Sequence, residues 1–178
     1  MKKIFFVQSY AGELYFRSME KMNRVLLSIG GNEGDREANL EEARMFISFN
    51  MGDVLKVSEV IETEAWGMPE GTEPFLNQLV EIETPLNIEK LYTEIVELEE
   101  YYGRTRKEGV YLDREMDVDV ISFNNEIIRE GKIQVPHARM HLREFILKPL
   151  AATWPEWIHP EMKMTAAQLL AELNKKED

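Results

Sequence analysis

The order in which strand and helix patterns follow one another constrains the fold of this chain more than any other feature. A strand is indicated by a short apolar run or by alternating apolar and polar residues, and a helix by apolar residues three and four positions apart. These patterns predict a strand at 25–29, a helix at 36–49, strands at 54–61 and 75–82, a helix at 87–103 and a strand at 117–123. The resulting order is β-α-β-β-α-β.

This order is typical of an α+β, ferredoxin-like core, in which an antiparallel sheet carries helices against one face. After it, Asn124 and Asn125 predict a turn into a further hairpin around 127–133. The segment 143–176 predicts two helical pieces that Pro155 and Pro160 separate. Such a fold supports many unrelated activities, so the function must come from particular side chains.

Composition limits the partners and the compartment. A chain of 178 residues predicts one domain at 22–178, preceded by an extension at 1–21 of unknown role. The formal charge of −12 argues against nucleic-acid and membrane partners, which would need a broad positive surface. The apolar run at 4–7 is too short for a signal peptide, and the absence of cysteine fits a reducing compartment. The sequence has no periodic apolar seam that would favour an oligomer. We therefore expect a cytoplasmic monomer.

Two carboxylates, Asp117 and Asp119, begin the last core strand. Residues two apart in a strand point to the same face and lie about 7 Å apart, close enough to converge on one or two hard cations. By itself, such a pair is more often a solvated surface feature. Arg104 and Arg106 form a basic cluster shortly before it, and guanidinium groups suit phosphate oxygens. Together, the carboxylates and arginines indicate phosphoryl transfer involving a Mg-nucleotide.

Other candidate residues admit two interpretations each. His137 and Arg143 could bind phosphate while Phe145 stacks on a ring, or they could be a surface pair with Phe145 in the core. Asn77 is polar within an apolar strand, so its amide must be satisfied by backbone or by a planar heterocycle.

The remaining candidates lie in loops and beside them. Trp66 and Phe75 flank a loop and could belong to the core or to a ligand platform. The loop 30–35 matches neither the GxxxxGK[ST] nor the GxGxxG phosphate-binding pattern, which favours a structural turn.

Several motifs together resemble those of a known family, 6-hydroxymethyl-7,8-dihydropterin pyrophosphokinase of folate biosynthesis. The resemblance runs from about residue 25 to residue 150, and its motifs recur in one order at compatible spacing. They are Leu27-Ser28-Ile29-Gly30-Gly31-Asn32 with Gly34-Asp35, Phe75-Leu76-Asn77, Gly103-Arg104-Thr105-Arg106, Arg114 with Asp117-Val118-Asp119, and Val135-Pro136-His137 with Arg143 and Phe145.

The resemblance implies an enzyme that transfers the diphosphate of ATP to the pterin hydroxymethyl group and releases AMP. It implies two Mg²⁺ ions at Asp117 and Asp119, and a lid at 104–114. The remaining implied roles divide by ligand. Residues along the phosphates would be Arg104, Arg106, Arg114, His137 and Arg143; Glu99 would lie near metal and phosphate, Val120 at adenine, and Thr63, Trp66, Phe75, Asn77, Tyr111 and Phe145 around the pterin.

The chain departs from the family pattern at a few positions, and two other functions remain open. Tyr111 stands where tryptophan is common, Glu64 and Ala65 replace a proline-rich pair, and Gln134 and Ala138 replace hydroxyl-bearing residues near the nucleotide. The first alternative function is a non-catalytic ferredoxin-like module that binds a nucleotide or metabolite. The second is a kinase that moves only the γ-phosphoryl group and therefore yields ADP.

Overall fold

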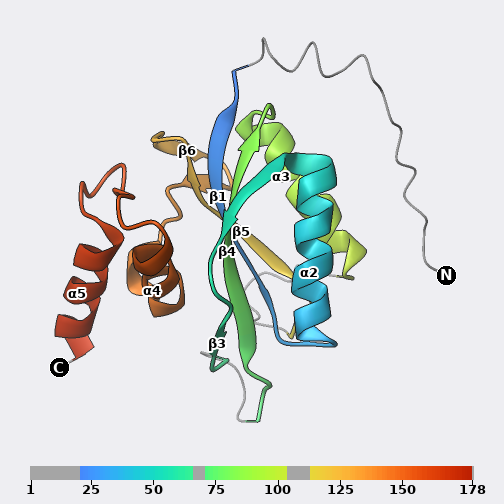
Figure 1. Cartoon of the computed structure of the whole chain (residues 1–178), viewed down its shortest axis with the longest axis horizontal. Coiled ribbons are helices and arrows are strands. Elements are labelled where there is room, and N and C mark those ends of the chain that lie inside the picture. Colours follow the sequence, from blue (N-terminus) through green and yellow to red (C-terminus); the bar gives the residue numbers. More distant parts are fainter. Residues whose placement is uncertain (1–20, 66–70, 104–112, 178) are drawn as a thin grey trace.

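The computed structural model describes residues 21–65, 71–103 and 113–177. Within these ranges, helices and strands alternate in the expected order, and an added hairpin and further helices follow (Figure 1). The elements are β1 (Asn23–Gly31), α2 (Arg36–Phe46), η2 (Ile47–Met51), β2 (Asp53–Val57), β3 (Ile61–Thr63), β4 (Phe75–Thr84), α3 (Ile88–Tyr101), β5 (Asp117–Phe123), β6 (Ile128–Glu130), β7 (Ile133–Val135), η3 (Met140–Leu142), α4 (Glu144–Thr153) and α5 (Ala166–Glu177).

The main sheet has the strand order β2-β4-β1-β5, with β3 also paired to β4. Every pairing in this sheet is antiparallel. The two central strands are therefore β4 and β1, and the last core strand, β5, lies at one edge beside β1. The predicted α+β, ferredoxin-like fold is confirmed.

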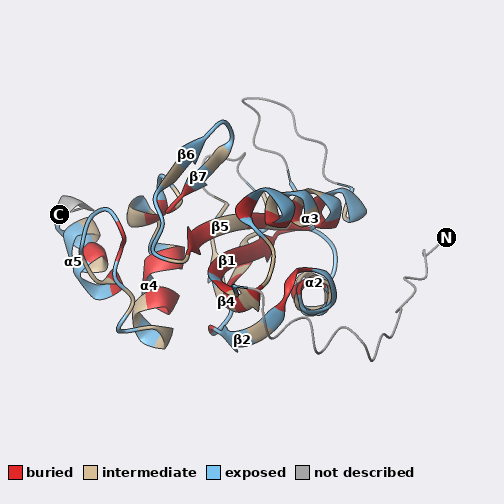
Figure 2. Ribbon diagram, turned by 90° about the horizontal axis from the view of Figure 1, so that it is seen from above, coloured by how far each residue is buried: buried red, intermediate tan, exposed pale blue. Residues whose placement is uncertain are grey.

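Apolar side chains fill both faces of the sheet; α2 and α3 cover one face, while α4 lies against the other and α5 packs on α4 (Figure 2). On one face, Leu27, Val80 and Val118 belong to a core that also takes Leu40 from α2 and Leu91 from α3. The opposite face carries a second core, which packs against α4 and α5. Its sheet residues are Leu26, Leu79 and Ile121. Because the sheet is packed on both faces, it forms a rigid support for the site.

One predicted strand is wrong in its extent, because 54–61 is divided into β2 and β3. The interruption falls at Ser58, whose hydroxyl accepts a hydrogen bond from the Leu79 backbone N–H at 2.9 Å. A serine side chain that bonds to the backbone in this way competes with the regular strand ladder. The predicted helix at 36–49 is also shorter as an α-helix: α2 ends at Phe46 and continues as the π-helical turn η2.

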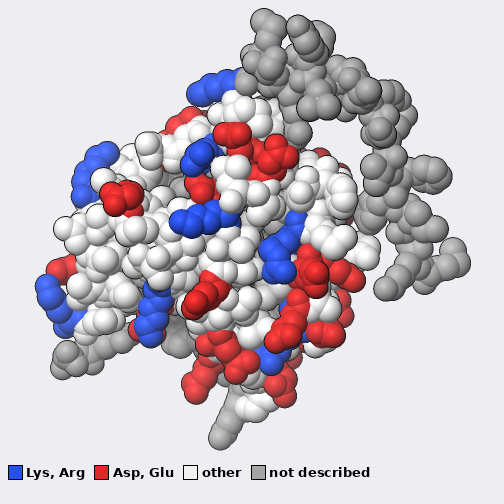
Figure 3. All heavy atoms as spheres, viewed as in Figure 1, with Lys and Arg blue, Asp and Glu red and all other residues white. Residues whose placement is uncertain are grey.

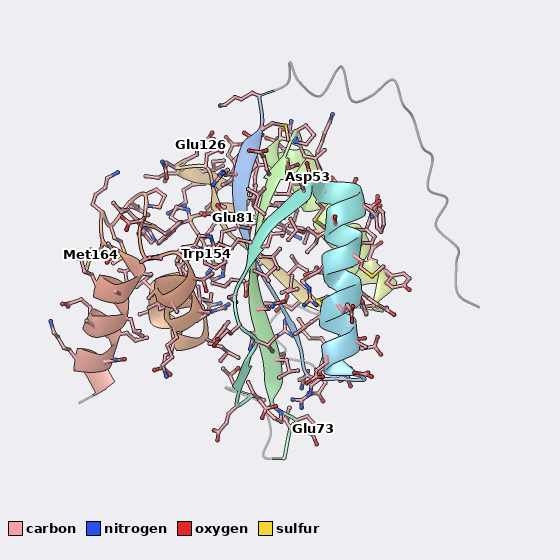
Figure 4. All side chains as sticks on the ribbon, viewed as in Figure 1. Asp53, Glu73, Glu81, Glu126, Trp154 and Met164 are labelled. Carbon is pink, nitrogen blue, oxygen red and sulfur yellow. The ribbon has the colours of Figure 1, made fainter. Side chains whose placement is uncertain are left out.

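The segments after the core follow the prediction closely. Asn124 adopts a positive φ of 50°, and β6 and β7 then form a separate two-stranded sheet. The tail contains α4 and α5, separated by irregular backbone around the two prolines. Trp154, at the end of α4, donates from Nε1 to Glu81 of β4 at 2.9 Å, which attaches the tail to the sheet (Figure 4). None of the helices in the described ranges combines the length and apolar character needed to cross a membrane.

Candidate active site

Asp117 and Asp119 lie on the face of the sheet that also packs against α4. Strand alternation places them on the side of Ile121, which belongs to the α4 core, while Val118 points into the core under α2 and α3. Both aspartates are partly exposed. The prediction that the two carboxylates lie on one face of the strand is therefore confirmed.

Each of these carboxylates is paired with an arginine from a different segment. Arg114 Nη1 lies 2.7 Å from Asp117 Oδ2, and Arg143 Nη1 lies 3.1 Å from Asp119 Oδ2. Arg143 immediately precedes α4, so the start of this helix is held at the edge strand β5. Arg114 Nε is buried and has no hydrogen-bond partner within the described residues.

His137 lies beside the same carboxylate group. Its backbone N–H donates to the Ile121 carbonyl at 2.9 Å, and its Nε2 lies 3.9 Å from Asp119 Oδ2. Burial lowers the pKa of His137 below its ordinary value; the Asp119 carboxylate opposes this shift and the Arg143 guanidinium adds to it. A neutral imidazole can donate one hydrogen bond to a phosphate oxygen without adding a positive charge.

Glu99 holds the strand between the two aspartates from the other side. Its side chain comes from α3 and is 2% exposed, and its Oε1 accepts a hydrogen bond from the Val118 backbone N–H at 3.1 Å. Val118 separates Asp117 from Asp119 in β5, so this bond restrains the position of both carboxylates.

Asn77 and Thr63 lie on the same face of the sheet, on β4 and β3. Asn77 Nδ2 donates to Thr63 Oγ1 at 2.9 Å. The Asn77 side chain also lies against β1: a Cβ added to Gly30 would be 2.5 Å from Asn77 Oδ1. Gly30 is paired with Asn77 on one side and with Asp117 on the other. A glycine at this position therefore lets the amide lie across β1, toward the first carboxylate.

Two aromatic rings support the arginines. The Arg114 guanidinium carbon lies 5.5 Å from the centroid of Phe75, and that of Arg143 lies 5.6 Å from the centroid of Phe145. These distances are within the range of cation–π attraction. Phe75 and Phe145, which were expected around the pterin, therefore also orient the two arginines of the site.

A pocket of about 270 Å³ lies at the outer edge of β5, between α3 and the β6–β7 hairpin. It is lined by four of the predicted nucleotide and metal residues, Glu99, Asp119, Val120 and His137. The predicted pterin residues on β3 and β4 lie outside this lining. The site thus has an edge pocket on one side of the aspartates and the Asn77–Thr63 pair on the other.

Some residues of this pocket were missed by sequence reasoning. Tyr92 and Lys132 both line the edge pocket. Tyr92 precedes Glu99 by seven residues, which puts both on the same side of a helix, and Lys132 precedes Gln134 by two residues in a hairpin. Helical and strand spacing could therefore have identified both. Four predicted site residues lie outside the described ranges: Trp66, Arg104, Arg106 and Tyr111.

Positive charge near the site comes from a few side chains of the site and not from a basic surface. On the face shown in Figure 3, the described lysine and arginine side chains are interspersed with acidic ones. Anion-binding groups in the described part of the site come instead from individual residues, Arg114 and Arg143, brought together by the fold.

Comparisons with known proteins show the family of this chain. A family model described as 7,8-dihydro-6-hydroxymethylpterin-pyrophosphokinase (HPPK) matches residues 26–155. A 2-amino-4-hydroxy-6-hydroxymethyldihydropteridine pyrophosphokinase of Bacillus subtilis is 38% identical over 130 residues, covering 72% of this chain and 77% of the relative. One of the same name from Porphyromonas gingivalis is 35% identical over 140 residues, covering 77% of this chain and 94% of the relative.

Among solved structures, Plasmodium falciparum HPPK-DHPS A437G with STZ-DHP superposes with a TM-score of 0.71 at 15% identity. The match covers 92% of this chain and 47% of that chain, so this chain spans about half the length of that protein. At this identity the superposition supports the fold alone. The family model and the relatives, by contrast, match most of this sequence at substantial identity. The chain therefore belongs to the 7,8-dihydro-6-hydroxymethylpterin-pyrophosphokinase family.

Proposed function

We propose that this chain transfers the diphosphate of ATP to the hydroxymethyl group of 6-hydroxymethyl-7,8-dihydropterin and releases AMP. Its family makes it an enzyme of folate biosynthesis, an ATP-dependent pyrophosphokinase. The observation that carries the proposal is the pair of carboxylates, Asp117 and Asp119, each bonded to an arginine on one face of the sheet. Carboxylates with guanidinium groups beside them are the side chains that a Mg-nucleotide requires.

Asp117 and Asp119 fit Mg²⁺ as ligands, and we propose that they hold two ions. The described residues contain no group of three or more His, Asp or Glu side chains arranged to hold a metal. Mg²⁺ is commonly bound by one or two carboxylates, with phosphate oxygens and water completing its shell, so a two-carboxylate site suits it. When bound, Mg²⁺ neutralises triphosphate charge and acidifies the attacking hydroxyl.

The arginines of the site are proposed to receive the phosphates. Arg114 approaches the aspartates from the segment before β5, and Arg143 approaches from the start of α4. Both guanidinium groups are partly buried, at 19% and 26% side-chain exposure, so each is poorly screened by water and strong as a phosphate ligand. His137 would add a hydrogen bond, and Arg104 and Arg106 would join them on the family pattern.

The polar groups of the pterin subsite are proposed to be Asn77 and Thr63. The Thr63 hydroxyl accepts one of the amide protons, which orients the Asn77 side chain, and the Asn77 carbonyl oxygen lies over Gly30. An oriented amide presents a fixed donor and acceptor to the edge of a planar heterocycle. Phe145 would stack on the ring, and we propose the same for Tyr111.

The nucleotide base is proposed to occupy the edge pocket. Val120 supplies an apolar wall, and Gln134 and Lys132 supply polar groups on the opposite side. A volume of about 270 Å³ approaches the lower limit of typical small-molecule sites, which suits one part of the nucleotide better than the whole of it. The triphosphate would then extend toward Asp119 and His137, which border the same pocket.

Phosphorus NMR of the products tests the proposal. Purified protein, MgATP and 6-hydroxymethyl-7,8-dihydropterin should give AMP and a pterin diphosphate, and a sample without Mg²⁺ should give neither. ADP would instead indicate a kinase that transfers the γ-phosphoryl group. Unchanged ATP in a sample that binds the pterin would favour the non-catalytic module. The lid at 104–114, the cytoplasmic location and the monomeric state stay predictions.

A further inference from the structure

Asn32 makes an unusual set of hydrogen bonds for a residue in a loop. It follows β1 directly and is 3% exposed. Its Nδ2 donates to Asp113 Oδ1 at 2.7 Å and to the Glu73 carbonyl at 3.2 Å, and its Oδ1 accepts from the Arg114 backbone N–H at 2.9 Å. Its own backbone N–H donates to the Arg114 carbonyl at 2.9 Å. Donor and acceptor of the side-chain amide are therefore both engaged.

These bonds join two segments that are distant in sequence and lead into opposite sides of the site. Glu73 comes two residues before Phe75, the first residue of β4. Figure 4 shows Glu73 beside this end of the strand. Arg114 comes three residues before Asp117, the first residue of β5. Asn32 thus restrains one strand that carries pterin groups and another that carries the metal carboxylates.

Close packing at the preceding residue adds to this restraint. A Cβ added to Gly31 would lie 2.1 Å from the Glu115 carbonyl oxygen, so the backbone of residues 114–115 passes directly against β1. In this arrangement the Arg114 guanidinium reaches Asp117 and lies over Phe75. Arg114 is thereby fixed at both ends: its backbone by Asn32, and its side chain by a carboxylate and a ring.

We propose that Asn32 is a positioning residue, which acts through Arg114 and through the start of β4 to keep the phosphate-binding and pterin-binding sides of the site in register. The proposal rests on the function proposed above. The side chain has to be an amide, because Asp113 and the Glu73 carbonyl need a donor while the Arg114 N–H needs an acceptor. An aspartate of the same shape would supply the acceptor and set a negative charge against both oxygens.

The test compares Asn32→Asp with Asn32→Asp/Asp113→Asn. In the double variant, the amide introduced at position 113 can donate to the carboxylate introduced at position 32, so the bond between the two positions is restored in reverse. Asn50→Asp is the matched control, because Asn50 Nδ2 also donates to a backbone carbonyl, that of Phe46, and this bond lies in the helical turn η2, which makes no bond to Asn32 or Arg114. Kinetics with MgATP and the pterin are measured together with amide hydrogen exchange of residues 71–76 and 113–118.

Asn32→Asp should lower kcat about 30- to 100-fold, the scale of a misplacement of about 1 Å, and raise the KM for the pterin by less than about tenfold. Exchange should rise in both segments. The double variant should recover about tenfold in kcat, and the control should match the wild type in both measurements. Unchanged exchange in Asn32→Asp, or a kcat in the double variant no higher than in the single one, would overturn the proposal. A wild-type protein that makes no AMP would refute the proposed function, while the exchange data would still decide the role of Asn32.

Discussion

Substitutions of Glu99 distinguish its structural role, a hydrogen bond to β5, from a role in catalysis near the metal and phosphates. The side chain is buried and accepts the Val118 backbone N–H, and it also borders the pocket near Asp119. Alanine would leave a buried N–H without a partner, which costs about 1–3 kcal/mol, and would leave a small cavity that adds about 1 kcal/mol. Glu99→Ala should therefore lower the free energy of unfolding by about 2–4 kcal/mol. Glutamine keeps an oxygen at the same place and should cost about 1 kcal/mol or less.

Urea unfolding measures these differences, and an unchanged m-value would show that they arise from stability alone. For a chain of this size, a loss of about 3 kcal/mol corresponds to a Tm lower by about 6–12 °C. Kinetics of AMP formation then decide the second role. If Glu99 serves only to hold β5, Glu99→Gln should keep nearly full kcat; if its charge contributes near the metal and phosphates, kcat should fall while stability is kept. A Glu99→Gln protein as unstable as Glu99→Ala would refute the assigned hydrogen bond.

Three further predictions concern the carboxylates, their arginine partner and pH. Asp117→Ala and Asp119→Ala should each abolish AMP formation while lowering Tm by only a few degrees, since both side chains are partly exposed; full activity in either variant would remove that residue from the metal site. Arg143→Ala should tighten Mn²⁺ binding without nucleotide by about 3- to 10-fold, because the guanidinium competes for Asp119. Lys148→Ala, which removes an exposed lysine of α4, is the control, and equal Mn²⁺ affinity in both variants would contradict the competition. Burial lowers the pKa of His159, so the unfolded chain takes up a proton at a higher pH than the folded protein, and the free energy of unfolding should fall below about pH 6.5. His159→Asn should reduce this loss, measured as the difference in the free energy of unfolding in urea between about pH 7 and pH 5. An equal difference in the variant and the wild type would contradict the prediction.

Local pattern predicted the elements of the fold and the face on which the carboxylates lie. The alternation of Asp117 and Asp119 with Val118 follows directly from strand geometry. Asp35 caps α2: its Oδ1 accepts the Ala38 backbone N–H, three residues later, at 3.1 Å. These features depend on residues close in sequence, where spacing alone decides which side chains share a face or a turn.

Long-range contacts escaped prediction, because nothing in the local pattern specifies them. Asn32 bonds to Arg114, 82 residues later, whereas its loop was interpreted only as a structural turn. The break between β2 and β3 depends on Ser58 meeting Leu79 across the sheet, 21 residues away. In both cases, a polar side chain that looks neutral in sequence finds its hydrogen-bond partners only after the sheet has formed.

The charge of the chain and the charge of its site lead to different expectations about anions. With a formal charge of −12, the protein as a whole repels anions, and this argues against polyanionic partners, which contact a broad surface. Charges beyond about 8 Å are largely screened at physiological salt, so a small ligand responds mainly to the groups that it touches. Those groups include Arg114 and Arg143, each paired with an aspartate. Two arginines and two aspartates so close together leave the site nearly neutral. Cations that bind the carboxylates would release both guanidinium groups to the phosphates. An acidic protein can therefore bind ATP at this site without a basic surface, provided that metal and nucleotide arrive together.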